Sequence, residues 1–211
     1  MEPFIKSEQY NFIKLQTQIL INGHATANDR DVVSTVKSVA KERVLGLFNE
    51  LDDRQKQLLD PIDTIKDSAQ AEAFLLELKP YVIPFKEVTE QTVKKLFPKA
   101  KKLKAPKLED IDLREISYLG WDDSGSGKKY IIAPRHDKFV GLHGTFKPSH
   151  KKGICAICSR FGEIGMFMSE TKGSVQGTFI KKGNYICNDS MQCNQNITTL
   201  DKLDDFITRI K

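Results

Sequence analysis

The chain of 211 residues has no long hydrophobic run, and no apolar stretch approaches the roughly 18 residues of a transmembrane helix. Its opening residues, Met1-Glu2-Pro3-Phe4, do not begin a basic-then-apolar leader, so we expect no cleaved signal peptide. Cysteine is scarce as well, and none precedes Cys155. These absences exclude a membrane-spanning helix and argue against a disulfide-rich exported protein. We therefore expect a cytoplasmic protein without membrane contact.

Charge of one sign is missing from part of the chain. No acidic residue occurs between Gln91 and Leu108, a stretch with seven lysines: Lys94, Lys95, Lys99, Lys101, Lys102, Lys104 and Lys107. Residues 1–90 contain 11 Lys+Arg and 15 Asp+Glu, a net of −4, whereas residues 91–211 contain 22 and 13, a net of +9. The lysine run is either a solvated connector or a contact surface for an acidic partner. The two parts of the chain therefore differ in the sign of their net charge.

The first 90 residues have the 3.6-residue apolar period of amphipathic helices. We predict one helix that starts at Ser7 and ends at Asn22-Gly23, and a second that runs from Asn28 or Asp29 to Leu51 with Val32, Val36 and Val39 on its apolar face. A third helix follows Asp52-Asp53 and kinks or breaks at Pro61, and a fourth runs from Ser68 to Pro80. Helices this short are marginal alone, so we predict that residues 1–88 form a small bundle.

The remaining residues, 89–211, mix helix and strand patterns. A fifth helix is predicted over 89–97, a hairpin over 118–132, and further strands near 139–146, 166–168 and 178–180. The chain then returns to a helix with one apolar face: Leu203, Phe206, Ile207 and Ile210. The predicted fold class is therefore α+β, with a helical bundle followed by a second domain of strands and helices.

The strongest chemical signal is the spacing of the four cysteines. Cys155 and Cys158 are separated by two residues, and after a gap of 28 residues Cys187 and Cys193 are separated by five. A two-residue gap lets one tight turn present two thiolates to a tetrahedral zinc ion, and Asp189-Ser190 can cap a helical turn that bridges the longer gap. The alternatives are four reduced thiols or two disulfides in an exported protein. We predict a zinc site.

Such a site serves structure, not catalysis. Four cysteine ligands leave no open position for water or substrate, so the zinc is expected to be structural, with one ion per chain. The loop Ser124-Gly125-Ser126-Gly127-Lys128 lacks the first glycine and the final Ser or Thr of a phosphate-binding loop. The four histidines form no recognisable metal pair or dyad. We therefore predict a binding protein and not an enzyme.

The residues beside the cysteines suggest a contact surface. The basic turn Lys181-Lys182-Gly183-Asn184-Tyr185 leads directly to Cys187, Ile154 precedes Cys155, and Phe206 lies on the terminal helix. A metal-held loop loses little entropy on binding, and aromatic residues are common hot spots. Tyr185 and Phe206 could instead close a small core, and the basic and aromatic composition also suits RNA.

Several stretches resemble the fusidic-acid-resistance proteins of the FusB type, which bind elongation factor G. The resemblance is carried by 116–121 (ISYLGW), 128–131 (KKYI), 153–158 (GICAIC), 181–187 (KKGNYIC), Asp189-Ser190, Cys193-Asn194 and Phe206-Ile207. The lysine-rich segment from Leu96 to Pro106 also fits. The similarity covers most of the chain and is densest from residue 92 onward.

This resemblance implies an N-terminal helical bundle and a C-terminal α/β domain that ends in a treble-clef-like zinc finger, at about 150–211. It also implies that the protein binds the C-terminal domains of elongation factor G, and we expect the protein to be a monomer. It would then release the factor from ribosomes on which fusidic acid has trapped it, so contact with the ribosome is indirect. By motif position, Lys182, Tyr185, Phe206 and Ile154 would form the contact surface. Ile154 stands where the family would place an aromatic residue.

The zinc site changes the charge balance. Four thiolates around one Zn²⁺ carry −2 together, so the filled chain has a net charge of +3 instead of +5, and residues 91–211 have +7 instead of +9. Part of the basic excess then balances the metal site. We expect a docking surface for an acidic protein, and a ribosome- or RNA-binding zinc protein is the alternative.

Overall fold

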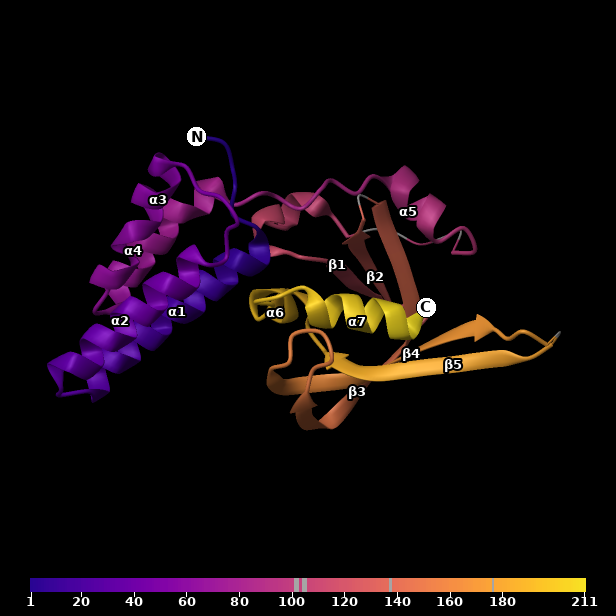
Figure 1. Ribbon diagram of the computed structural model, residues 1–211. Helices are drawn as coiled ribbons and strands as arrows, with labels where there is room; N and C mark the ends of the chain where they lie inside the picture. Colours follow the sequence, from indigo (N-terminus) through magenta and orange to yellow (C-terminus); the bar gives the residue numbers. More distant parts are fainter. Residues whose placement is uncertain (101–102, 104–105, 137, 176) are drawn as a thin grey trace. The chain divides into compact units, whose positions relative to one another are not determined.

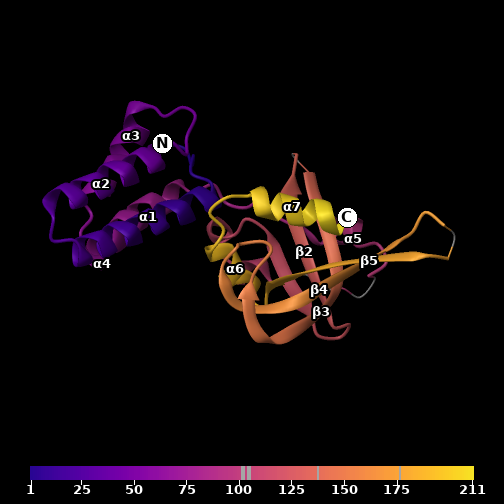
Figure 2. The same ribbon diagram turned by 60° about the horizontal axis from the view of Figure 1, so that its bottom comes forward.

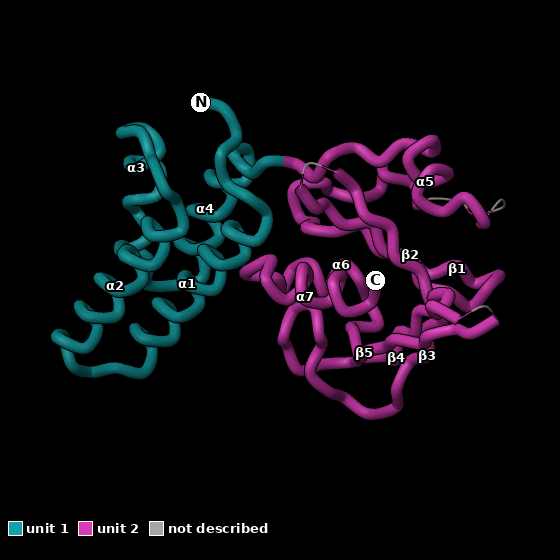
Figure 3. Tube along the Cα trace, turned by 45° about the vertical axis from the view of Figure 1, so that its right-hand side comes forward, with its two compact units in different colours: residues 1–83 teal, residues 84–211 magenta. Residues whose placement is uncertain are grey.

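The computed structural model describes residues 1–100, 103, 106–136, 138–175 and 177–211. The chain forms two compact units, Met1–Ile83 and Pro84–Lys211 (Figure 3). The predicted domain boundary after residue 88 stays a prediction. Three lysines of the basic run, Lys101, Lys102 and Lys104, lie outside the described residues. Among the residues that are described, no helix is long and apolar enough to cross a membrane.

The first unit is helical, as the sequence predicts (Figure 1). Its elements are α1 (Ser7–Thr26), α2 (Arg30–Leu45), α3 (Asp53–Leu59), η1 (Asp60–Thr64), α4 (Ser68–Leu78) and η2 (Lys79–Tyr81). The side chains of Asp29, Asp52 and Asp67 accept backbone N–H bonds at the starts of α2, α3 and α4. Each such cap stabilises a helix by about 1 kcal/mol. The predicted kink or break near Pro61 takes the form of a change of helix type, because α3 ends at Leu59 and Pro61 lies in the first turn of η1.

Two details of the first unit differ from the prediction. The helix α1 does not end at Asn22-Gly23 but continues to Thr26. Gly23 faces Val36, whose Cγ1 would lie 3.3 Å from a Cβ at Gly23, so the missing side chain allows α1 and α2 to pack closely. The helix α2 ends at Leu45 and not at Leu51.

The buried face of α2 also differs from the prediction. Ala40 and Val44 are buried, whereas Val32 and Val39 are 47% and 36% exposed. The same core contains Ile5, Ile13, Leu20, Leu59, Ile62, Ile65, Ala71, Phe74, Leu78 and Val82. A parallel bridge between Ile5 and Val82 joins the two ends of this unit.

The second unit is an antiparallel sheet between helices (Figures 1 and 2). Its elements are α5 (Glu90–Leu96), η3 (Leu108–Asp110), η4 (Leu113–Glu115), β1 (Leu119–Asp123), β2 (Lys128–Arg135), β3 (Lys138–Ile154), β4 (Phe161–Lys172), β5 (Phe179–Cys187), α6 (Ser190–Gln195) and α7 (Asp201–Ile210). The strands follow in the order β1-β2-β3-β4-β5, each antiparallel to its neighbour. The α+β class is confirmed.

The alternation of side chains along the strands places a core on each face of the sheet. On one face, Ile131 and Leu142 share a cluster with the apolar side of α7, where Leu203, Phe206, Ile207 and Ile210 are all buried as predicted. On the other face, Tyr130 and Ile132 pack with Val93 and Phe97 from α5 and its end: this cluster also contains Val88, Ile116 and Leu119. The sheet is thus covered on both sides.

Candidate metal centre and its surroundings

The four cysteines come from three separate parts of the second unit. Cys155 and Cys158 lie in the turn between β3 and β4, Cys187 ends β5, and Cys193 lies in α6. The predicted cap is present, because Asp189 Oδ1 accepts hydrogen bonds from the backbone N–H groups of Met191 at 2.7 Å and Gln192 at 3.3 Å. This cap starts α6 immediately after β5 and so turns Cys193 back toward Cys187.

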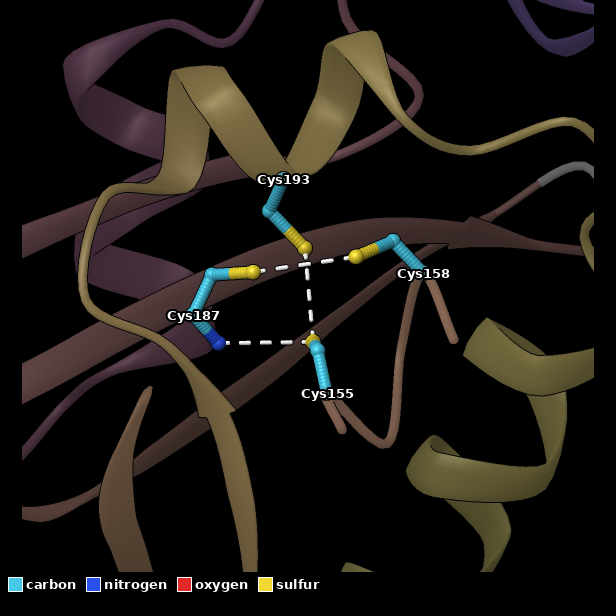
Figure 4. A group of neighbouring side chains, drawn as sticks. All are labelled: Cys155, Cys158, Cys187 and Cys193. Carbon is cyan, nitrogen blue, oxygen red and sulfur yellow. Dashed lines mark hydrogen bonds between the residues drawn. The ribbon is translucent and has the colours of Figure 1, made fainter. Parts of the chain in front are cut away.

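The four sulfur atoms converge on one point (Figure 4). All lie within 4.8 Å of one another, and the Sγ–Sγ distances are 3.7 Å for Cys155–Cys193 and 3.6 Å for Cys158–Cys187. A zinc ion with bonds of about 2.3 Å requires sulfurs about 3.8 Å apart at the corners of a tetrahedron. The arrangement therefore fits zinc, and these distances are far too long for a disulfide, whose S–S bond is about 2.05 Å.

The surroundings favour a thiolate at Cys155 but not at all four cysteines at once. The backbone N–H groups of Ile157 and Cys187 each donate to Cys155 Sγ at 3.3 Å. Hydrogen bonds from the other cysteines, first Cys158, lower the pKa of Cys155, whereas hydrogen bonding to Cys155 raises the pKa of Cys193. The four thiols therefore cannot all ionise when they face only one another. A divalent cation removes that conflict, because it stabilises every thiolate together.

A buried lysine connects the sheet to the loop between the last two cysteines. Lys129 is 1% exposed, and its Nζ donates to Asp122 Oδ2 at 2.9 Å and to the carbonyl oxygen of Asn188 at 3.0 Å. The same ammonium lies 4.5 Å from the ring centroid of Phe146. A buried charge needs such partners, and here they include the backbone immediately after Cys187.

Asn194, which follows Cys193, connects α6 to the chain segment before β1. Its Oδ1 accepts from the N–H groups of Ser117 at 2.8 Å and Tyr118 at 3.1 Å. Its Nδ2 donates to the carbonyl oxygens of Tyr118 and Ser190, both at 2.9 Å. The side chain is 1% exposed, so these bonds form without competition from water.

The strand β1 also lies very close to α6 at Gly120. A Cβ there would lie 2.5 Å from Ser190 Oγ and 2.8 Å from a ring carbon of Tyr118. Only glycine lets β1 lie this close to the first residue of α6.

We expect Gly120→Ala to destabilise the second unit by about 1–3 kcal/mol through overpacking. Urea denaturation checks this, with Gly162→Ala as the control because nothing lies within 4 Å of a Cβ there. Equal midpoints for the two variants would contradict it.

The four residues predicted for partner binding have different surroundings. Ile154 is 67% exposed, Tyr185 is 43% exposed, and Lys182 is partly exposed. A backbone hydrogen bond ties Tyr185 to the cysteine turn, because the N–H of Ala156 donates to the carbonyl oxygen of Tyr185 at 2.8 Å. Phe206 differs: it is 2% exposed and its ring centroid lies 5.7 Å from that of Phe167. The side chain of Phe206 therefore belongs to the core. This is the alternative to a contact residue that the sequence leaves open.

One exposed aromatic residue beside the metal centre was not singled out from the sequence. Phe161 is 72% exposed and pairs with Ile154 across the β3–β4 hairpin. Its position three residues after Cys158 is the signal that could have identified it, because short hairpins place such residues opposite each other. An aromatic ring therefore lies beside Ile154, although Ile154 itself is aliphatic.

Comparison with known proteins agrees with this architecture. Residues 4–86 match the family "Elongation factor G-binding protein, N-terminal", and residues 93–209 match "FBP C-terminal treble-clef zinc-finger". The solved structure of the fusidic acid resistance protein FusC aligns with a TM-score of 0.89 and 36% sequence identity, over 99% of this chain and 98% of that one. No curated protein matches the chain.

The treble-clef family and the cluster of four cysteines together assign one structural zinc ion to Cys155, Cys158, Cys187 and Cys193. The two family matches cover most of the chain, and the FusC alignment covers nearly all of it. The chain belongs to the elongation factor G-binding protein family, in which a helical N-terminal part precedes a treble-clef zinc finger.

Proposed function

We propose that this protein binds the C-terminal domains of elongation factor G through its zinc finger, as a monomer in the cytoplasm. We further propose that binding releases the factor from ribosomes on which fusidic acid has trapped it. Membership of the family and the 36% identity with a fusidic acid resistance protein support this function. The mechanism is protection of the drug's target, so it needs binding and no catalysis.

The observation that carries the proposal is that apolar side chains next to the zinc ligands are exposed. Ile154 and Phe161 flank the first cysteine pair, and Tyr185 precedes the second pair by two residues. Exposed apolar groups on a rigid frame are typical of interaction sites, because burying them costs little ordering entropy. The neighbouring cations, Lys181 and Lys182, suit a partner with acidic groups at the rim.

Replacement of Tyr185 tests this surface. We expect Tyr185→Ala to weaken binding of purified elongation factor G by tenfold or more, because loss of an aromatic hot spot costs about 2 kcal/mol or more. Titration calorimetry with zinc-loaded protein measures the affinity, and thermal denaturation shows that the fold is kept. The same variant should release the factor more slowly from fusidic-acid-stalled ribosomes, as followed by ribosome pelleting.

The matched control is Leu76→Ala in α4, which removes another exposed apolar side chain, 69% accessible, from the first unit. That variant should bind normally. Phe206→Ala provides a second comparison, because it should lower stability by about 3–5 kcal/mol and affect binding only through folding. If Tyr185→Ala and Leu76→Ala bind equally well, the zinc-finger surface is not the contact. Protection of the factor's C-terminal domains in hydrogen exchange would support the proposed docking site.

A further inference from the structure

A cavity of about 860 Å³ lies in the second unit between the end of α5 and the β1–β2 turn. Its walls include Phe97, Lys99, Lys128, Tyr130 and His143. Ligand pockets commonly have volumes of roughly 300–1,000 Å³. None of the residues that line it is a zinc ligand or one of the four residues predicted by motif position to contact elongation factor G. The cavity therefore needs its own explanation.

Three rings form a ladder across the sheet at this cavity. Trp121, Tyr130 and His143 occupy neighbouring cross-strand positions on β1, β2 and β3. Successive ring centroids are 5.5 Å and 5.8 Å apart, with interplanar angles of 20° and 13°. Phe97 packs edge-on, 5.0 Å from Tyr130. The ladder ends at His143, which is exposed and lines the cavity, so its ring offers a stacking surface for another flat ring.

The charges around the cavity favour an anion. Lys99 and Lys128 both line it, and neither ammonium is in an ion pair within the described part of the chain. The acidic residue of the lining, Asp123, accepts a hydrogen bond from Ser126 in the turn. Partial desolvation of the ring lowers the pKa of His143, and the charges of Lys128 and Lys99 lower it further. Both effects favour the neutral imidazole, whose ring is suited to stacking.

We propose that this cavity binds a nucleotide, with its base stacked on His143 and its phosphate between Lys99 and Lys128. A simple anion would leave the ring surface unused, and a neutral aromatic molecule would leave both ammonium groups without a counter-charge. Only a ligand with both features uses the whole site. A free nucleotide and one nucleotide of a single RNA strand share this chemistry. The proposal is independent of the binding to elongation factor G.

The chain contains its own reporter for this site. Trp121 is the one tryptophan of the sequence, and it stacks on Tyr130, which lines the cavity. Full-length, zinc-loaded protein is titrated with AMP, GMP, CMP and UMP, and separately with octauridylate, while Trp121 fluorescence and the His143 ring resonances are recorded. We expect saturable changes with at least one of these probes. Uridine has a base but no phosphate, and inorganic phosphate has no base. Each should therefore bind at least tenfold more weakly than the nucleotide.

The two arms identify the source of the ligand. Saturation by a mononucleotide assigns the site to free nucleotides, whereas saturation by octauridylate alone assigns it to an RNA strand. Either result supports a nucleotide site. The proposal is overturned if neither arm saturates at millimolar concentration, or if uridine or phosphate binds as tightly as the nucleotide.

Variants separate the cavity from general attraction to a basic surface. Lys128→Glu and His143→Ala should each weaken binding by about tenfold, since the first removes a phosphate contact and the second a stacking partner. The control is Lys138→Glu, which makes the same charge change at an exposed position of β3 that does not line the cavity. If Lys128→Glu and Lys138→Glu weaken binding equally, the attraction is not localised and the site assignment fails. Circular dichroism confirms that each variant is folded.

Discussion

Removal of zinc is expected to unfold the zinc finger and leave the helical unit folded. A structural zinc site contributes roughly 10–16 kcal/mol of apparent binding free energy. A whole domain is stable by only about 5–15 kcal/mol, so the second unit cannot lose its metal and stay folded. The first unit has a separate apolar core and contains no cysteine. Its helices should therefore persist after treatment with a chelator.

Circular dichroism and limited proteolysis, with zinc measured by elemental analysis, test this expectation. Chelation should abolish the strand signal and make residues 84–211 sensitive to protease, while a helical fragment survives. Cys193→Ser should have the same effect, because it removes a ligand that lies deep in the core, at 0% exposure. Ala156→Ser is the matched control, since it places a serine in the cysteine turn without removing a ligand.

Two outcomes would contradict the structural role of the metal. The first is a chelated protein that keeps both its strand signal and its resistance to protease. The second is a Cys193→Ser protein that still holds one zinc ion and melts at the temperature of Ala156→Ser.

The metal centre could be predicted from the sequence because its determinants are local. A two-residue spacing defines the turn that holds Cys155 and Cys158, and a single Asp189 side chain defines the start of α6. The terminal helix was equally predictable, since its apolar residues repeat every three to four positions over a short segment. Local patterns such as these do not depend on which other elements are nearby.

The features that could not be predicted depend on tertiary packing. The apolar period of α7 identifies Phe206 as part of an apolar face, but whether that face is covered by the sheet or open to a partner is decided by strands distant in sequence. Asn22-Gly23 is a typical helix-ending sequence, yet α1 continues to Thr26, and Gly23 instead lies where α1 faces Val36 of α2. Lys129 resembles a surface residue of a hairpin, and only the fold shows that it is buried beside Asn188.

Loss of the Asn194 side chain is expected to have a large effect on the stability of the second unit. Asn194→Ala removes the four hydrogen bonds described above and leaves the backbone groups of Ser117, Tyr118 and Ser190 without these partners in a buried site. An unsatisfied buried group costs about 1–3 kcal/mol, and such costs are not additive. We expect a total loss of about 3–5 kcal/mol in the free energy of unfolding of the second unit.

Asn196→Ala is the matched control, because its side chain makes one hydrogen bond, from Nδ2 to the carbonyl oxygen of Gln192, at the exposed end of the same helix. That change should cost about 1 kcal/mol or less. Urea denaturation of the zinc-loaded variants measures the difference, and equal midpoints would refute the role assigned to Asn194. Because Asn194 follows Cys193 directly, its loss should also speed zinc release to a chelator, which the control should not do. A fall in stability with unchanged zinc release would show that Asn194 holds the sheet to α6 without positioning the ligand beside it.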